Sequence, residues 1–219
     1  MMNQIKTLNI PKIDRIEDIQ FENVINILDN KGQRYIINSL NWKEEYPYHP
    51  LSSFTIAHDG EYIYIDFFVR CNYLKAENYE NNSPVSQDSC VEFFVAPKSD
   101  NHYWNFEFNC IGAINASHRT ERKNPTRLND DELAQVLRYA SCGNKPFQEL
   151  EGIFTWNLLV AIPLSLISIK YNNAPISMKG NFYKCASKCS QPHYLSWNPI
   201  YTDKPDFHRQ EFFGNIILD

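Results

Sequence analysis

Apolar and polar residues alternate along much of the chain, and residues 104–110 show this pattern most clearly. In that run, apolar and polar residues occupy alternate positions. The apolar set is Trp104, Phe106, Phe108 and Cys110, and the polar set is Asn105, Glu107 and Asn109. Because successive side chains of a strand point to opposite faces, this pattern predicts a strand with its apolar set, Trp104 included, in the core.

The same reasoning predicts strands along most of the chain. Asp59-Gly60 lies between the apolar runs 53–58 and 61–69, which is a strong signal for a β-hairpin. Prolines exclude a regular element at 46–50, and one helical turn is expected at 130–134. Further strands are expected at 89–96, 102–110, 113–118, 135–141, 153–162, 176–185, 194–197 and 212–218. No long amphipathic helix is predicted, so the fold class is all-β. We expect an antiparallel β-sandwich of jelly-roll or immunoglobulin-like architecture with long loops.

Length and composition fit one domain over residues 1–219, with residues 1–20 as an extended lead-in. A chain of 219 residues with 43% hydrophobic and 14% aromatic residues is sufficient for one sandwich with a sizeable core. With only 7 glycines and no G-x-x-x-x-G-K-[ST] or G-x-G-x-x-G motif, the chain lacks the usual cradle for nucleotides. The net charge of −5 and the absence of a basic stripe argue against nucleic acid as a partner. Residues 118–127 are interpreted as a solvated loop.

The N-terminal sequence carries no apolar stretch after its first lysine, so no signal peptide is predicted. No run of 18 apolar residues occurs, which predicts no membrane-spanning segment. We therefore expect a cytoplasmic protein. A chain trimmed of its leader would instead come from the periplasm or the outside of the cell. The sequence gives no indication of the oligomeric state.

Six cysteines are present, but a chain of this length needs no disulfide framework to be stable. Cys185 and Cys189, followed by His193, are the closest approach to a metal-binding pattern. Their spacing is wider than that of a C-x-x-C pair and no fourth ligand is evident, so zinc is not favoured.

The predicted strands 89–96 and 102–110 place two carboxylates on one polar face. In 89–96 the better core set is formed by the valines and Phe93, so Glu92 faces away from the core. A short connection joins the strands, so we expect them to pair and to bring Glu92 and Glu107 together, with Asn105 and Asn109 beside them. Carboxylates and amides are suited to hydrogen-bond the hydroxyls of a sugar. The alternative interpretation is an ordinary solvent-facing sheet surface.

Three segments near the C-terminus, 179–184, 193–197 and 205–209, mix aromatic and polar residues as binding loops do. Together with the polar face they define a predicted ligand-binding set. In this set, the sheet supplies carboxylate and amide groups that bind sugar hydroxyls, and a neighbouring strand supplies a tyrosine and a lysine. A tryptophan stacks on the sugar, and one histidine is included. The set is Glu92, Glu107, Asn109, Tyr183, Lys184, Trp197 and His208. Alternatively, Trp197 and Phe207 only close one end of the sandwich.

Several runs resemble the family 9 carbohydrate-binding modules of the wider DOMON-like superfamily. Residues 88–95 resemble the family's D-x-x-V-E-x-F strand, and 156–164 resemble its strand that ends in an Ile-Pro turn. Residues 212–218 are similar to its closing F-G-x-[LI]-x-[LF] strand, and 54–69 to its early hairpin. The resemblance covers roughly residues 40–219. The longer stretches 105–109 and 180–185 are similar to stand-alone family 9-like proteins of gut Bacteroidetes.

The resemblance implies a non-catalytic β-sandwich that binds a glycan end or small saccharide, often between two aromatic rings, in polysaccharide utilisation. Trp197 is a better candidate for one of these rings than Trp104, which the alternation places in the core. No residue is assigned to the second ring. Calcium is a candidate structural ion because some family members carry it, although no Asp-rich loop marks a site here. No other cofactor is expected.

Three alternatives to carbohydrate binding stay open. Glu92 and Glu107, about 5–6 Å apart on paired strands, suit a glycoside-active enzyme. A haem domain would need an axial methionine, and Met178 with Lys179 is a poor match. A protein-interaction module without a small ligand is the third.

Overall fold

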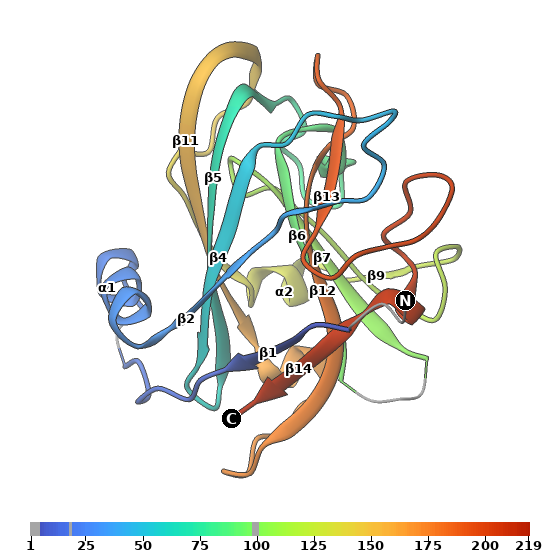
Figure 1. Ribbon diagram of the computed structural model, residues 1–219. Helices are drawn as coiled ribbons and strands as arrows, with labels where there is room; N and C mark the ends of the chain where they lie inside the picture. Colours follow the sequence, from blue (N-terminus) through green and yellow to red (C-terminus); the bar gives the residue numbers. More distant parts are fainter. Residues whose placement is uncertain (1–4, 18, 98–100) are drawn as a thin grey trace.

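The computed structural model describes residues 5–17, 19–97 and 101–219 and consists of two β-sheets packed face to face (Figure 1). The first sheet runs in the order β10 (Leu137–Ala140), β11 (Phe147–Pro163), β5 (Tyr62–Ala76), β4 (Leu51–His58) and β2 (Gln33–Ile36). The second runs β1 (Thr7–Ile10), β14 (Gly214–Leu218), β12 (Ile176–Ala186), β6 (Cys90–Ala96), β7 (Tyr103–Asn109), β8 (Ile114–Arg119) and β9 (Thr126–Arg127). The short strands β13 (His193–Ser196) and β3 (Ser39–Leu40) extend this sheet beside β12.

The predicted all-β sandwich is confirmed, and among the described residues the named strands pair antiparallel except at one place, while an isolated bridge between Lys12 and His58 is also parallel. Strand β1 pairs with β14 in parallel, with Leu8 opposite Ile216. The N-terminal lead-in therefore contains a strand that closes the edge of the second sheet. Residues 1–4 and 18 of that lead-in lie outside the described residues.

The main core fills the space between the sheets. It receives alternate side chains of the central strands, among them Phe67 from β5, Phe93 from β6 and Phe106 from β7, which are all fully buried. Trp104 is half-buried and packs against the same core, as the alternation predicts. The expected hairpin is also present, because β4 and β5 pair with His58 opposite Ile63.

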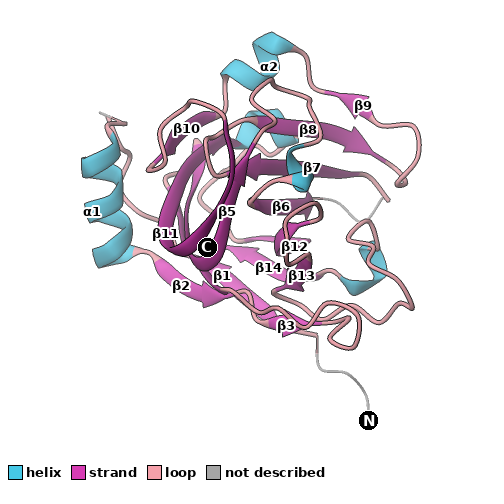
Figure 2. Cartoon of the chain, turned by 90° about the horizontal axis from the view of Figure 1, so that it is seen from above, coloured by secondary structure: helices cyan, strands magenta, loops and turns pink. Residues whose placement is uncertain are grey.

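One helix was not predicted, because residues Phe21–Lys31, expected only to contain a short apolar run, form the 11-residue helix α1. Val24 and Leu28, one helical turn apart, are its buried residues. They pack on Tyr64 and Ala57 of the first sheet, so α1 covers the outer face of that sheet (Figures 1 and 2). The single turn expected at 130–134 is confirmed as α2 (Asp130–Ala134), which begins with a capping box at Asn129.

The outer face of the second sheet is also covered. The segment that follows β3 and the long loop between β13 and β14 lie over it, together with the 3-10 turns Val85–Gln87 and Gln210–Phe212. They enclose a second apolar cluster that includes Trp42, Phe94, Tyr183 and Phe207. No helix among the described residues has the length and apolar character needed to cross a membrane.

Candidate functional site

Glu92 and Glu107 lie directly opposite each other on the antiparallel strands β6 and β7, as predicted. The row continues to Tyr183 on β12 and to Asn115 on β8, because Tyr183 pairs with Glu92 and Asn115 with Glu107. These four side chains share the outer face of the second sheet, since their strand neighbours Val91 and Phe106 belong to the main core. The sheet therefore presents a polar row away from the core.

This face is not an open solvent surface, which corrects the alternative interpretation made from sequence. Glu92 is 2% exposed and Glu107 is 6% exposed. A pocket of about 230 Å³ lies between this face and the covering loops. We call it the β6–β7 pocket, and its lining residues are Ser86, Glu92, Glu107, Arg122, Cys185, Ser187, Tyr194, Pro205, Asp206, Phe207 and His208.

The β6–β7 pocket brings together Glu92, Glu107 and His208 of the predicted set. Larger hollows of about 440 and 630 Å³ lie beside Trp104 and beside Arg138. Neither of these contains a residue of the predicted set. Buried carboxylates in a concave site are the more specific indication of a binding function.

Two amide side chains hold the Glu107 carboxylate in place. Asn105 Nδ2 donates to Oε1 at 2.9 Å and Asn115 Nδ2 donates to Oε2 at 3.1 Å. Behind this pair, Arg119 Nε donates to Asn105 Oδ1 at 2.6 Å. Burial raises the pKa of Glu107, while these amides and the charge of Arg119 oppose the rise. The carboxylate is thus fixed in orientation at the pocket wall.

The surroundings of Glu92 are different, because its partners are thiols. Cys185 Sγ donates to Glu92 Oε1 at 3.1 Å, and Cys90 Sγ lies 3.8 Å from the same oxygen. Burial raises the pKa of Glu92 well above its usual range, and the nearby Cys185 and Glu107 add to the effect. The protonated form is therefore favoured, and it offers a hydroxyl donor at the pocket floor.

The polar face also holds the loop that closes the pocket. Tyr183 donates its hydroxyl to the carbonyl oxygen of Phe207 at 3.1 Å, and its ring stacks on Phe207 with centroids 4.1 Å apart. His208 Nδ1 is hydrogen-bonded to the Tyr103 hydroxyl at 2.9 Å. Burial, reinforced by Arg119 and Arg122, lowers the pKa of His208 to about 3, so this imidazole is neutral near pH 7.

Aromatic and charged residues that were not selected from sequence complete the lining. Tyr194 of β13 is half-buried, and its ring meets those of Phe207 and Tyr46 edge to face. Arg122 forms an ion pair with Asp206 at 3.4 Å. Segments 193–197 and 205–209, which were recognised as binding-loop sequence, contain three of these residues, Tyr194, Asp206 and Phe207. Arg122 was not recognised, because a charge in a solvated loop gives no local signal of where the loop folds.

Asn109 lies on the same face, but its side chain is hydrogen-bonded to neighbouring parts of the chain. Its Nδ2 donates to the Asn78 carbonyl at 2.6 Å and to Asp88 Oδ2 at 3.0 Å. Its Oδ1 accepts from the backbone N–H groups of Ile111 and Ala113. These bonds shape the β7–β8 turn, and Asn109 does not line the β6–β7 pocket.

Lys184 points to the opposite side of the sheet from Tyr183, because consecutive strand residues alternate. It is 1% exposed, and its Nζ contacts the carbonyl of Cys185 at 2.6 Å and His193 Nε2 at 2.9 Å. Neither Lys184 nor the fully buried Tyr183 lines the β6–β7 pocket.

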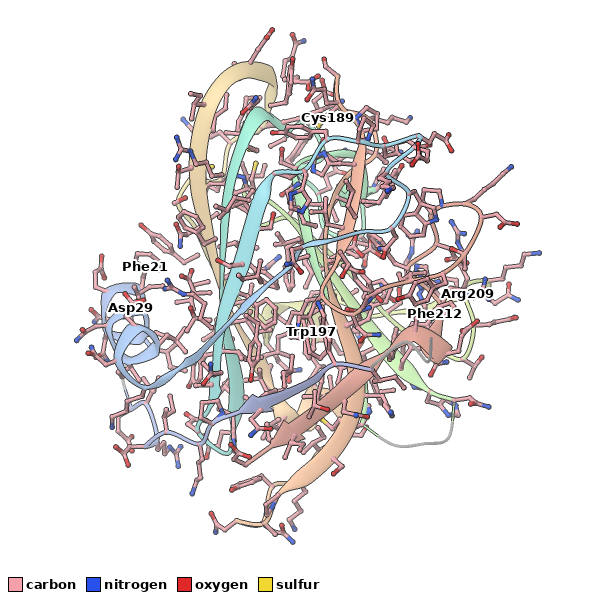
Figure 3. All side chains as sticks on the ribbon, viewed as in Figure 1. Phe21, Asp29, Cys189, Trp197, Arg209 and Phe212 are labelled. Carbon is pink, nitrogen blue, oxygen red and sulfur yellow. The ribbon has the colours of Figure 1, made fainter. Side chains whose placement is uncertain are left out.

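Trp197 is in the core, which corrects its expected place as an accessible ring. It is 3% exposed and packs edge to face on Phe182 and Tyr35. Figure 3 shows it in the middle of the molecule, between the two sheets. The absence of a Cβ at Gly214 makes room for this indole, since an added Cβ there would lie 2.3 Å from the ring. The alternative interpretation of Trp197 as a core residue fits the structure.

The cysteines do not come together in the way that the spacing of Cys185, Cys189 and His193 suggests. In the part of the chain that the structure describes, Cys185 groups with Cys90 and Glu92, and the ligand atoms of all three lie within 4.8 Å of one another. Cys189 and His193 do not join that group.

Comparison with known proteins shows the family. The sequence profile of carbohydrate-binding family 9 matches residues 22–218, which include every strand except β1 and all of α1 except its first residue. The chain therefore belongs to carbohydrate-binding family 9, a family of non-catalytic carbohydrate-binding modules. No curated protein matches the chain significantly.

Solved structures agree with this assignment. A "putative carbohydrate-binding protein" from Bacteroides uniformis is 35% identical, with a TM-score of 0.93 over 99% of this chain and 100% of that one. A family 9 module from Caldicellulosiruptor kristjanssonii in complex with glucose has 15% identity and a TM-score of 0.62, over 98% of this chain and 96% of that one. The same organism's module in complex with cellotriose has 14% identity and a TM-score of 0.61, over 97% and 93%. At these lower identities the likeness concerns the fold.

Proposed function

We propose that this protein binds a carbohydrate in the β6–β7 pocket, without catalysing its conversion. The observation that carries the proposal is the arrangement of Glu92 and Glu107 beneath Tyr194 and Phe207. Glu92 favours the protonated form and supplies a donor, whereas Glu107 supplies acceptor oxygens oriented by two amides. Donors and acceptors side by side are suited to the adjacent hydroxyls of a sugar.

The size and charge of the pocket support a small, neutral ligand. Its volume of about 230 Å³ is below the ~300–1,000 Å³ typical of sites for drug-sized molecules. A single sugar unit, such as the end of a glycan, is of suitable size. Glu107 and Asp206 place negative charge at the wall, and Arg122 is paired with Asp206. Anionic sugars would therefore be disfavoured.

Two findings outside the pocket support the same proposal. The chain belongs to carbohydrate-binding family 9, and modules of the same fold from C. kristjanssonii are complexed with glucose and cellotriose. A role in polysaccharide utilisation is the corresponding biological proposal.

Calorimetric titration with a panel of neutral mono- and disaccharides, repeated with added calcium, tests this function. We expect saturable binding of at least one neutral sugar and no consumption of the sugar during the titration. Release of product would favour the glycoside-active alternative. The absence of binding across a panel that a known family 9 module recognises would contradict the proposal and favour a protein-interaction module.

A further inference from the structure

We propose that Cys90, Glu92 and Cys185 form a binding site for one zinc ion at the floor of the β6–β7 pocket. The strand register places the two cysteines together, because Cys90 on β6 lies directly opposite Cys185 on β12. Glu92 follows Cys90 by two residues, so its side chain leaves the sheet on the same face. A regular part of the sheet, with no flexible loop involved, therefore holds all three ligand atoms.

The distances fit the coordination shell of a small thiophilic cation. Zinc–sulfur bonds of ~2.3 Å and zinc–oxygen bonds of ~2.1 Å separate neighbouring ligand atoms by roughly 3.6 Å in a tetrahedron. Here Glu92 Oε1 lies 3.1 Å from Cys185 Sγ and 3.8 Å from Cys90 Sγ. The three ligand atoms all lie within 4.8 Å of one another.

The chemistry of these donors selects among cations. Calcium takes six or more oxygen ligands, and two sulfur atoms do not suit it. Zinc binds thiolate sulfur and carboxylate oxygen, in closed tetrahedral sites or in sites with three protein ligands and an open position. The site is therefore different from the structural calcium that the family resemblance suggested.

Among the residues that the structure describes, no lysine or arginine forms an ion pair with Glu92. Glu107 lies opposite Glu92 and adds negative charge to the same face. A divalent cation bound here would pair with the two thiolates and with Glu92, which would then be a carboxylate ligand of the ion and no longer a hydroxyl donor to the pocket.

The fourth coordination position faces the pocket. Glu92 and Cys185 both line the pocket, whereas the sheet backbone lies behind the three ligands. Three protein ligands with one open position are typical of zinc sites that bind an exchangeable water or ligand atom. Zinc binding itself needs no sugar, so it can be tested separately from the proposed function.

The test is a titration of the reduced full-length protein with Co²⁺ followed by Zn²⁺, with no sugar present. We expect one equivalent of Co²⁺ to produce the near-ultraviolet thiolate-to-cobalt charge-transfer band, and Zn²⁺ to displace it. Zinc binding should release protons, because the two thiols and the Glu92 carboxyl group must ionise to bind the ion. The absence of the band, or binding of Co²⁺ without thiolate character, would overturn the proposal.

Variants locate the site. Cys90→Ser and Cys185→Ser should each weaken Zn²⁺ binding by at least roughly tenfold, whereas Cys142→Ser should leave it unchanged. Cys142 is a matched control because it is a half-buried free thiol outside the cluster. Loss of the band in Cys142→Ser alone would overturn the assignment. Should either cluster variant fail to fold, X-ray absorption of the zinc-loaded wild type decides, since the proposal requires two sulfur neighbours at ~2.3 Å.

Discussion

Glu92 and Glu107 are cross-strand partners with opposite environments. Thiols surround Glu92, whereas two amides and, behind them, a guanidinium orient Glu107. Burial raises the pKa of both, but more strongly that of Glu92, which has no amide donors to oppose the effect. Two carboxyl groups that are chemically identical in sequence thus become a donor and an acceptor, which is the combination that a pair of sugar hydroxyls requires.

Replacing Glu107 by glutamine should weaken sugar binding by roughly tenfold, because a charged acceptor becomes a neutral one. The amide introduced would also face the donor groups of Asn105 and Asn115. Calorimetry with the best ligand of the panel measures the change. Glu17→Gln serves as the control, since the Glu17 side chain is 85% exposed and does not line the pocket. Equal losses in both variants would contradict the role of Glu107.

Tyr194 is the lining ring best placed to pack on a sugar face. Tyr194→Ala should lower affinity by roughly tenfold, whereas Tyr194→Phe should retain most of it because the ring is kept. Thermal unfolding of both variants separates loss of binding from loss of fold. If Tyr194→Phe binds as weakly as Tyr194→Ala, the hydroxyl group and not the ring is the important element.

Trp197 should matter for stability and not for recognition. Trp197→Ala should lower the free energy of unfolding by about 3–5 kcal/mol, as expected for removal of a buried aromatic residue. The milder Trp197→Phe should fold and bind sugar with unchanged affinity. Denaturant unfolding and calorimetry on the same samples test both statements. A folded Trp197→Phe protein that no longer binds sugar would show that the indole takes part in sugar binding.

Asp66 gives a prediction about pH. Burial raises the pKa of Asp66 to about 6, although Asn157 donates to it and opposes the shift. Since the folded-state pKa lies above the unfolded-state value, the folded state holds the proton more tightly. This stabilising effect is complete below about pH 4 and is lost as the pH rises through about 6.

Asp66→Asn removes that pH dependence. The variant should be more stable than the wild type by about 3 kcal/mol at pH 7 and close to it at pH 4. Denaturant unfolding of both proteins at the two pH values measures the difference. A stability difference that is the same at both values would contradict the assigned titration.

The alternation of apolar and polar residues was enough to predict the sandwich and the face that Glu92 and Glu107 share. The face on which a strand residue lies follows from the local pattern. This pattern could not reveal that this face is covered, since the covering loops are far away in sequence. The helix α1 was missed because its buried positions are only Val24 and Leu28, and its packing partner Tyr64 lies on another element.

The positions of several single residues also depend on contacts with distant parts of the chain. Lys184 was grouped with Tyr183, although neighbours on a strand face opposite sides. Trp197 directly follows β13, and only the packing of the whole chain turns its ring into the core. Arg122 lies in a loop whose sequence carries no indication of the pocket that it reaches.

A crystal structure of the protein soaked with its best sugar ligand tests the central claim most directly. The account predicts a sugar ring in the β6–β7 pocket, with hydroxyls hydrogen-bonded to Glu92 and Glu107 and one face against Tyr194. A sugar bound elsewhere on the sandwich, for instance beside Trp104, with the β6–β7 pocket empty, would contradict it.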